Sequence, residues 1–119
     1  MLEAIRRLLG LAPPFWDAGL AARLPGRYVL VGITYTDADG APQRLEQKHG
    51  VVVLADREQG IAIELQGSGH GETYWLPPQT SNLHRAKAGT YRLKASGDVI
   101  ENPDYLSNWT IAPPDPGDA

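Results

Sequence analysis

The chain has 119 residues, 42% of them hydrophobic, and a formal net charge of -3. This composition predicts one globular domain rather than a disordered chain, and the acidic total argues against nucleic-acid binding. Cysteine is absent, which excludes disulfides, thiolate metal sites and a cysteine nucleophile.

Residues 1–26 are predicted to form an amphipathic helix followed by an apolar linker. The helix would span residues 2–9, with one apolar face that comprises Leu2, Ile5, Leu8 and Leu9. So short a helix is not stable alone in water, so we expect it to pack on the domain, on a second copy as a homodimer, or on a membrane surface. A second helical turn within residues 15–24 would plug the core with Phe15, Trp16, Leu20 and Leu24.

The N-terminal segment does not resemble a signal peptide. Glu3 and the pair Arg6–Arg7 interrupt its apolar residues. No apolar run in the chain approaches the roughly 18 residues of a membrane-spanning helix. We therefore expect a cytoplasmic protein with no membrane span.

Three strands are predicted over residues 27–36, 43–55 and 61–65. The turns between them, at residues 37–40 and 56–60, combine acidic residues with glycine, as tight hairpins require. Gly50 lies in the middle of the second strand and predicts a bulge or a bend, so that this strand is shared by two halves of a sheet. In the third strand the alternation places Ile61, Ile63 and Leu65 inward and Ala62, Glu64 and Gln66 outward.

Shorter elements follow in the second half of the chain. Strands are predicted over residues 72–76, 90–94 and 108–111, with a brief pairing at 99–100. Residues 80–82 are typical helix-capping residues and predict a helical turn over 83–86. The proline-rich tail, residues 113–119, is expected to be disordered because it has nothing to bury.

These elements predict an all-β domain over residues 27–112. No helix separates the strands, which excludes a parallel α/β fold. We expect a small, partly open antiparallel barrel, SH3-like or OB-like, of five or six strands, on which the short N-terminal helix packs.

Catalytic and metal-binding patterns are weak. The loop at residues 67–71 is rich in glycine but leads into a strand and lacks the lysine of a phosphate-binding loop. The three histidines do not have the spacing of a metal site, and no nucleophile motif is present. We therefore assign no catalytic residue, metal or cofactor. The alternative is a small-ligand-binding or enzymatic barrel in which His49, His70 and Glu72 share a pocket.

A basic segment free of acids lies between Glu72 and Asp98. It contains Arg85, Lys87, Arg92 and Lys94. Arg92 and Lys94 alternate with apolar residues and should project from the outer face of a strand. Tyr74 and Trp75 precede them, and aromatic rings beside basic groups are typical of protein-binding hot spots and of single-stranded nucleic-acid grooves. The acidic total favours a protein partner.

Tyr105 and Trp109 flank a polar segment near the end of the chain. Both rings could line a shallow peptide-binding groove or cap the core. Trp109 alternates with Ile111, which favours the core, whereas Tyr105 stays open between the two interpretations.

Several segments resemble a group of small bacterial proteins without an assigned function. They are residues 31–35, 37–40, 50–53, 89–93 and 102–109. The resemblance spans about residues 27 to 111 and implies a soluble bacterial protein, with no functional residue to carry over.

The hypothesis that the residues favour is a non-catalytic protein-interaction module. Its partner would dock near Tyr74, Trp75, Arg92, Lys94 and Tyr105. The alternatives are the pocket of His49, His70 and Glu72, and weak single-stranded nucleic-acid binding through residues 84–94.

Overall fold

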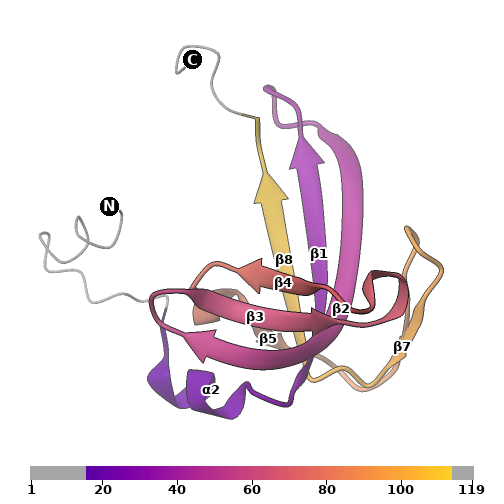
Figure 1. Cartoon of the computed structure of the whole chain (residues 1–119). Coiled ribbons are helices and arrows are strands. Elements are labelled where there is room, and N and C mark those ends of the chain that lie inside the picture. Colours follow the sequence, from indigo (N-terminus) through magenta and orange to yellow (C-terminus); the bar gives the residue numbers. More distant parts are fainter. Residues whose placement is uncertain (1–15, 114–119) are drawn as a thin grey trace, which may run out of the picture.

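The computed structural model describes residues 16–113, which form one bent six-stranded sheet and a small second sheet (Figure 1). The six-stranded sheet has the order β4-β3-β2-β1-β8-β5, and β6 pairs with β7 in the other. The elements are α2 (Ala18–Arg23), β1 (Tyr28–Thr36), β2 (Pro42–Asp56), β3 (Gly60–Leu65), β4 (Thr73–Leu76), β5 (His84–Arg85), β6 (Thr90–Arg92), β7 (Val99–Glu101) and β8 (Tyr105–Ile111). The predicted all-β class is confirmed.

The β1–β2 hairpin turns where the acid-and-glycine pattern predicts it. The Asp37 carboxylate accepts hydrogen bonds from the backbone amides of Asp39 and Ala41, at 2.9 Å each. Gly40 has a φ of +87°, a conformation that side chains with a Cβ rarely adopt. These contacts hold the long β1–β2 pair in register from Tyr28 opposite Val51 onward.

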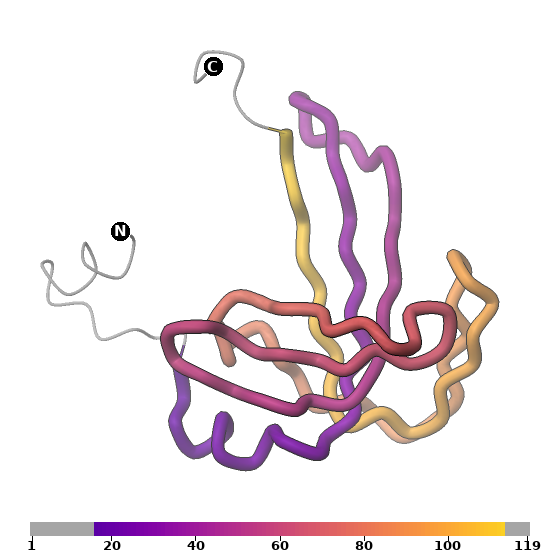
Figure 2. The backbone as a smooth tube through the Cα atoms, viewed as in Figure 1, coloured from indigo at the N-terminus to yellow at the C-terminus, as the bar shows by residue number. Residues whose placement is uncertain are grey.

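The bend of the sheet lies at Gly50, as the sequence predicts. Residues 42–51 of β2 pair with β1, whereas residues 50–56 pair with β3. The two halves of the sheet therefore cross over each other, as the tube in Figure 2 shows. A Cβ at Gly50 would collide with the backbone carbonyl oxygen of Glu64, so the close approach of β3 requires glycine here.

The main core fills the space between these two halves. Ile61, Ile63 and Leu65 face inward from β3, as predicted, and pack with the buried side chains of β1. Leu24, at the end of α2, is fully buried, and Trp16 and Leu20 pack against the same core. The predicted apolar plug is therefore present in the described residues. Phe15, its fourth member, lies outside them.

The β6–β7 hairpin packs on a smaller core of its own. Leu93 and Ile100 from the hairpin region contact Leu30 of β1, with Tyr28 and Leu106 at the margin. The brief pairing expected at residues 99–100 is confirmed, because Ile100 lies opposite Tyr91.

Two predictions about the second half of the chain are wrong. The sheet is not wholly antiparallel, because β8 runs parallel to β1. The helical turn predicted over 83–86 is absent: a 3-10 turn (Thr80–Asn82) leads directly into β5, whose two residues pair with β8. The chain returns to β1 after a long excursion through the other strands, so a parallel pairing is sterically accessible.

The sheet does not close into a barrel within residues 16–113, since β4 and β5 form its two edges. No helix in this part of the chain is long and apolar enough to cross a membrane. The amphipathic helix predicted over residues 2–9 and the tail after residue 113 lie outside the described residues.

Candidate functional site

A chain of hydrogen-bonded side chains links Tyr28, His49 and Asp98. The hydroxyl of Tyr28 lies 2.6 Å from His49 Nδ1, and His49 Nε2 lies 2.8 Å from an Asp98 carboxylate oxygen. His49 is buried, with 6% of its surface exposed. The three residues come from β1, β2 and the turn before β7, so the chain joins the main sheet to the small one.

Local backbone contacts position this chain. The backbone amide of Gln66 donates to the His49 carbonyl at 2.9 Å, which brings the turn after β3 against the histidine. Gly67 there has a φ of +66°, and a Cβ on it would collide with the carboxylate of Asp98 and lie 2.7 Å from His49 Nε2. Glycine is thus required both by the backbone conformation and by the proximity of this pair.

The proton positions follow from the partners. An ionised carboxylate only accepts hydrogen bonds, so His49 Nε2 carries the hydrogen that it donates to Asp98. In the neutral form of the ring, Nδ1 then accepts the Tyr28 hydroxyl hydrogen. The hydrogen bond from His49, supported by the backbone amide of Ser68, holds the pKa of Asp98 below its ordinary value of 3.8.

Electrostatics argues against a reactive tyrosine. Burial, and secondarily the negative charge of Asp98, raise the pKa of Tyr28 above 10.0. Its phenol is therefore less readily ionised than a free tyrosine. Both nitrogens of His49 are also already bonded, so neither is available as a base or a metal ligand unless a bond breaks.

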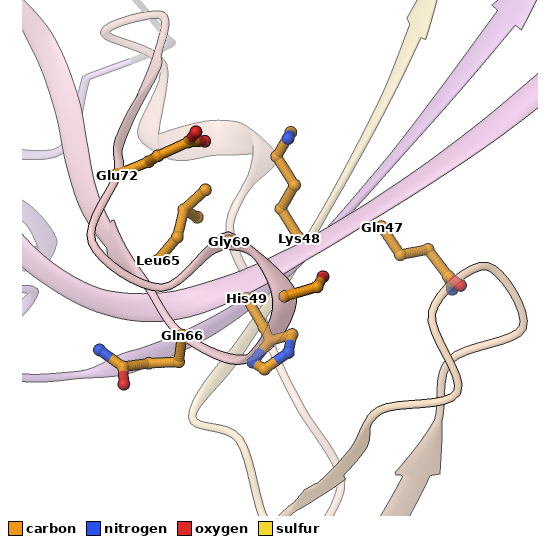
Figure 3. A pocket seen from close by; sticks show the side chains of 8 residues that line it. Gln47, Lys48, His49, Leu65, Gln66, Gly69 and Glu72 are labelled. Carbon is orange, nitrogen blue, oxygen red and sulfur yellow. The ribbon is translucent and has the colours of Figure 1, made fainter.

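A pocket of about 150 Å³ lies beside His49 (Figure 3). Its lining residues are Gln47, Lys48, His49, Leu65, Gln66, Ser68, Gly69 and Glu72. Figure 3 shows Lys48 and Glu72 on one side of this pocket and the His49 ring on the other. His70 is exposed and does not line the pocket, so the structure does not bring His49, His70 and Glu72 together. Within residues 16–113, no three His, Asp or Glu side chains form a group that could hold a metal ion.

The five predicted partner-binding residues do not form one surface. Trp75 is 46% exposed on β4, whereas Tyr74 points to the opposite face, packs against the core and lies under the Lys48 ammonium at 5.2 Å. Arg92 and Lys94 are exposed, as predicted, but belong to the second sheet and the turn that follows β6.

Tyr105 belongs to the main core, with only 7% of its surface exposed. Its ring is not exposed to a partner, so we no longer include Tyr105 among the predicted partner-binding residues. Tyr105 pairs with Val29 of β1 because β8 begins at residue 105, three residues earlier than predicted.

Trp75 belongs to a row of apolar residues across three strands, which the sequence did not predict. Ala62 of β3 lies between Leu54 of β2 and Trp75 of β4 in the register of the sheet, on the face opposite to the core. Leu54 is 41% exposed and Val53 beside it 48% exposed. The register shifts between Val52 and Leu54, so a bulge breaks the alternation and places both side chains at the surface. Ala62 itself is buried, with 2% of its surface exposed. We call the exposed residues Val53, Leu54 and Trp75 the outer apolar row.

Comparisons with protein-family models, curated proteins and solved structures found no match.

Proposed function

We propose that this protein is a non-catalytic module that binds a partner protein through the outer apolar row. The observation that supports this most directly is the exposure of Trp75, Leu54 and Val53 on one region of a sheet whose other face carries the core. Large apolar side chains grouped at a surface are typical of interaction sites. Tryptophan contributes more binding free energy at such sites than most residues do.

The surroundings of the row suit a protein partner. Exposed Glu64 and Thr73 pair with each other on the same face of β3 and β4, two residues along the strands from Ala62 and Trp75. Exposed Arg57 and Glu58 stand in the turn that follows β2. An apolar centre bordered by polar groups is the usual anatomy of a protein–protein interface.

The occupied hydrogen bonds of His49 favour a binding role over a catalytic one. A general base needs a free lone pair within reach of the substrate. Here Tyr28 and Asp98 hold both ring nitrogens.

A small-ligand site is the second candidate, because the pocket beside His49 combines Gln47, Lys48 and Glu72 around about 150 Å³. Its residues offer hydrogen bonds and one charge of each sign, which suits a small polar molecule. Single-stranded nucleic-acid binding has weaker support, because Arg92 and Lys94 lie in another sheet than Trp75.

We also propose, from architecture and resemblance, that the bent sheet is a partly open SH3-like or OB-like barrel of a bacterial cytoplasmic protein. The strand shared by two crossing halves supports the barrel assignment.

The binding proposal is tested with variants in the outer apolar row. Tagged wild type, Trp75→Ala, Leu54→Ala and Val99→Ala would capture proteins from a nuclease-treated lysate, with identification by mass spectrometry. Val99 is a matched control, because it is 51% exposed and apolar but belongs to the second sheet. We expect a protein that wild type and Val99→Ala retain and that both row variants lose.

Calorimetry with the purified partner then measures how much binding free energy each variant loses. Trp75→Ala should weaken binding by about 2 kcal/mol, roughly thirtyfold. If both row variants bind every partner with wild-type affinity, the outer apolar row is not the interface. Arg92→Ala and Lys94→Ala in the same assay test the basic residues separately.

A further inference from the structure

A second pocket lies where the end of α2, the start of β1, β5 and the start of β8 meet. Its lining residues are Arg23, Arg27, Arg85, Asp104 and Tyr105, around a volume of about 60 Å³. None of these arginines is near another in sequence, except Arg23 and Arg27. The fold therefore brings three arginines to the lining of one pocket, on a protein whose formal net charge is -3.

These arginines have no acidic partner among residues 16–113. None of the three takes part in an ion pair or a side-chain hydrogen bond there. Arg23 alone could be explained by its place in the last turn of α2, where a positive charge favours the helix. That explanation does not extend to Arg27 and Arg85, which lie outside any helix.

Asp104, the acid that lines the pocket, is already engaged by the backbone. Its Oδ2 accepts a hydrogen bond from the Tyr28 amide at 2.8 Å. Its own amide donates to the Tyr28 carbonyl, and its carbonyl accepts from the amide of Ala86. These bonds fix Asp104 between β1, β5 and β8. With three arginines and one aspartate in its lining, the pocket has an excess of two positive side-chain charges.

The Tyr105 hydroxyl supplies a further donor. The side chain is nine-tenths buried, yet its hydroxyl has no hydrogen-bond partner within residues 16–113. No buried polar side-chain atom there lacks a partner, so this oxygen must be reached by solvent. Because Tyr105 lines the pocket, the pocket is the opening that we assign to its hydroxyl.

We propose that this pocket binds a phosphate-type oxyanion. The guanidinium groups only donate hydrogen bonds and the phenol can donate one more, whereas one arginine fork alone would satisfy a carboxylate. A phosphate group has more acceptor oxygens and up to two negative charges, which match the donors and the charge excess here. The volume admits such a group but not a nucleoside.

This site differs from the glycine-rich loop of residues 67–71. That loop contains a 3-10 turn (Gly67–Gly69) and continues into β4 rather than into a helix, so it lacks the geometry of a phosphate-binding loop. The arginine pocket shares no residue with it or with the outer apolar row.

The test measures binding of inorganic phosphate to the full chain by NMR titration at constant ionic strength. Arg85→Ala and Arg27→Ala should each weaken binding about tenfold, the loss of a charge-assisted pair. Tyr105→Phe, which keeps the ring, should weaken binding about threefold. Arg92→Ala is the matched control, since it removes the same charge from the second sheet and should leave binding unchanged.

A second ligand distinguishes a phosphorylated protein from free phosphate as the source of the bound phosphate group. Tighter binding of a phosphoserine peptide than of inorganic phosphate would identify the ligand as a phosphorylated protein, and equal binding would identify free phosphate. Thermal melts check that each variant is folded. The proposal is overturned if acetate binds as tightly as phosphate, if phosphate shifts no resonance of the pocket residues, or if Arg92→Ala weakens binding as much as Arg85→Ala does.

Discussion

His49 is buried with both ring nitrogens hydrogen-bonded, which makes Tyr28 and Asp98 structural partners. A buried polar group is tolerated when it is fully bonded, and it becomes destabilising when one partner is removed. The contribution of this chain of bonds should therefore appear in stability rather than in turnover.

Tyr28→Phe tests the first bond. The change keeps the ring but leaves Nδ1 of His49 without its donor, so we expect the free energy of unfolding to fall by about 1–2 kcal/mol. Urea denaturation measures it. Tyr91→Phe is the control, because that hydroxyl donates to the exposed Lys87 carbonyl and its loss should cost less than about 0.5 kcal/mol. Equal effects of the two variants would contradict a special role for the buried bond.

Asp98 should make stability fall in acid. Its pKa in the folded state is lower than its ordinary value of 3.8, so the folded protein favours the ionised carboxylate. The stabilisation is complete above pH 3.8 and is lost as the pH falls through the depressed folded-state pKa. Unfolding measured from neutral pH downward should show this loss in the wild type and a smaller one in Asp98→Asn. Parallel curves for the two proteins would contradict the assignment.

At the scale of the elements, β2 belongs to both halves of the sheet, and this arrangement depends on Gly50. The β3 backbone lies so close that no side chain fits, and the other half of the same strand pairs with β1. Glycine at this one position therefore allows the two halves of the sheet to cross at β2.

Gly50→Ala should separate β3 from β2. The added methyl would collide with the carbonyl oxygen of Glu64, and backbone must shift to admit it, so we expect a loss of about 3 kcal/mol in unfolding free energy. Chemical denaturation gives the value. Gly40→Ala is the control: its Cβ would meet open space, so only its positive φ opposes the change, at roughly 1 kcal/mol. A Gly50→Ala protein no less stable than Gly40→Ala would contradict the close approach.

At the scale of the whole molecule, two cores and one chain of hydrogen bonds hold two sheets together. The main core lies inside the bent sheet, and the smaller one anchors the β6–β7 hairpin on Leu30. The hydrogen bond between His49 of β2 and Asp98, which precedes β7, also connects the six-stranded sheet to the β6–β7 hairpin. The outer apolar row and the three arginines of the second pocket belong to neither core, whereas Tyr105 lines that pocket and also packs in the main core.

Local order in this protein was readable from its sequence. The alternation of residues 61–65, the acid-and-glycine turns and the glycine of β2 predicted the first three strands and their bend, because side-chain period and turn conformation are properties of neighbouring residues. The apolar pattern also predicted the burial of Leu24, since the apolar face of a short amphipathic helix is buried against its domain.

Long-range pairing was decided only in three dimensions. Nothing local to residues 105–111 indicates that they pair in parallel with β1, and that pairing is what buries Tyr105. The bulge that exposes Leu54 depends on how β3 lies against β2, and the meeting of Arg23, Arg27 and Arg85 depends on three separate elements. Turns and alternation are encoded by adjacent residues, whereas these contacts arise from the packing of segments far apart in the chain.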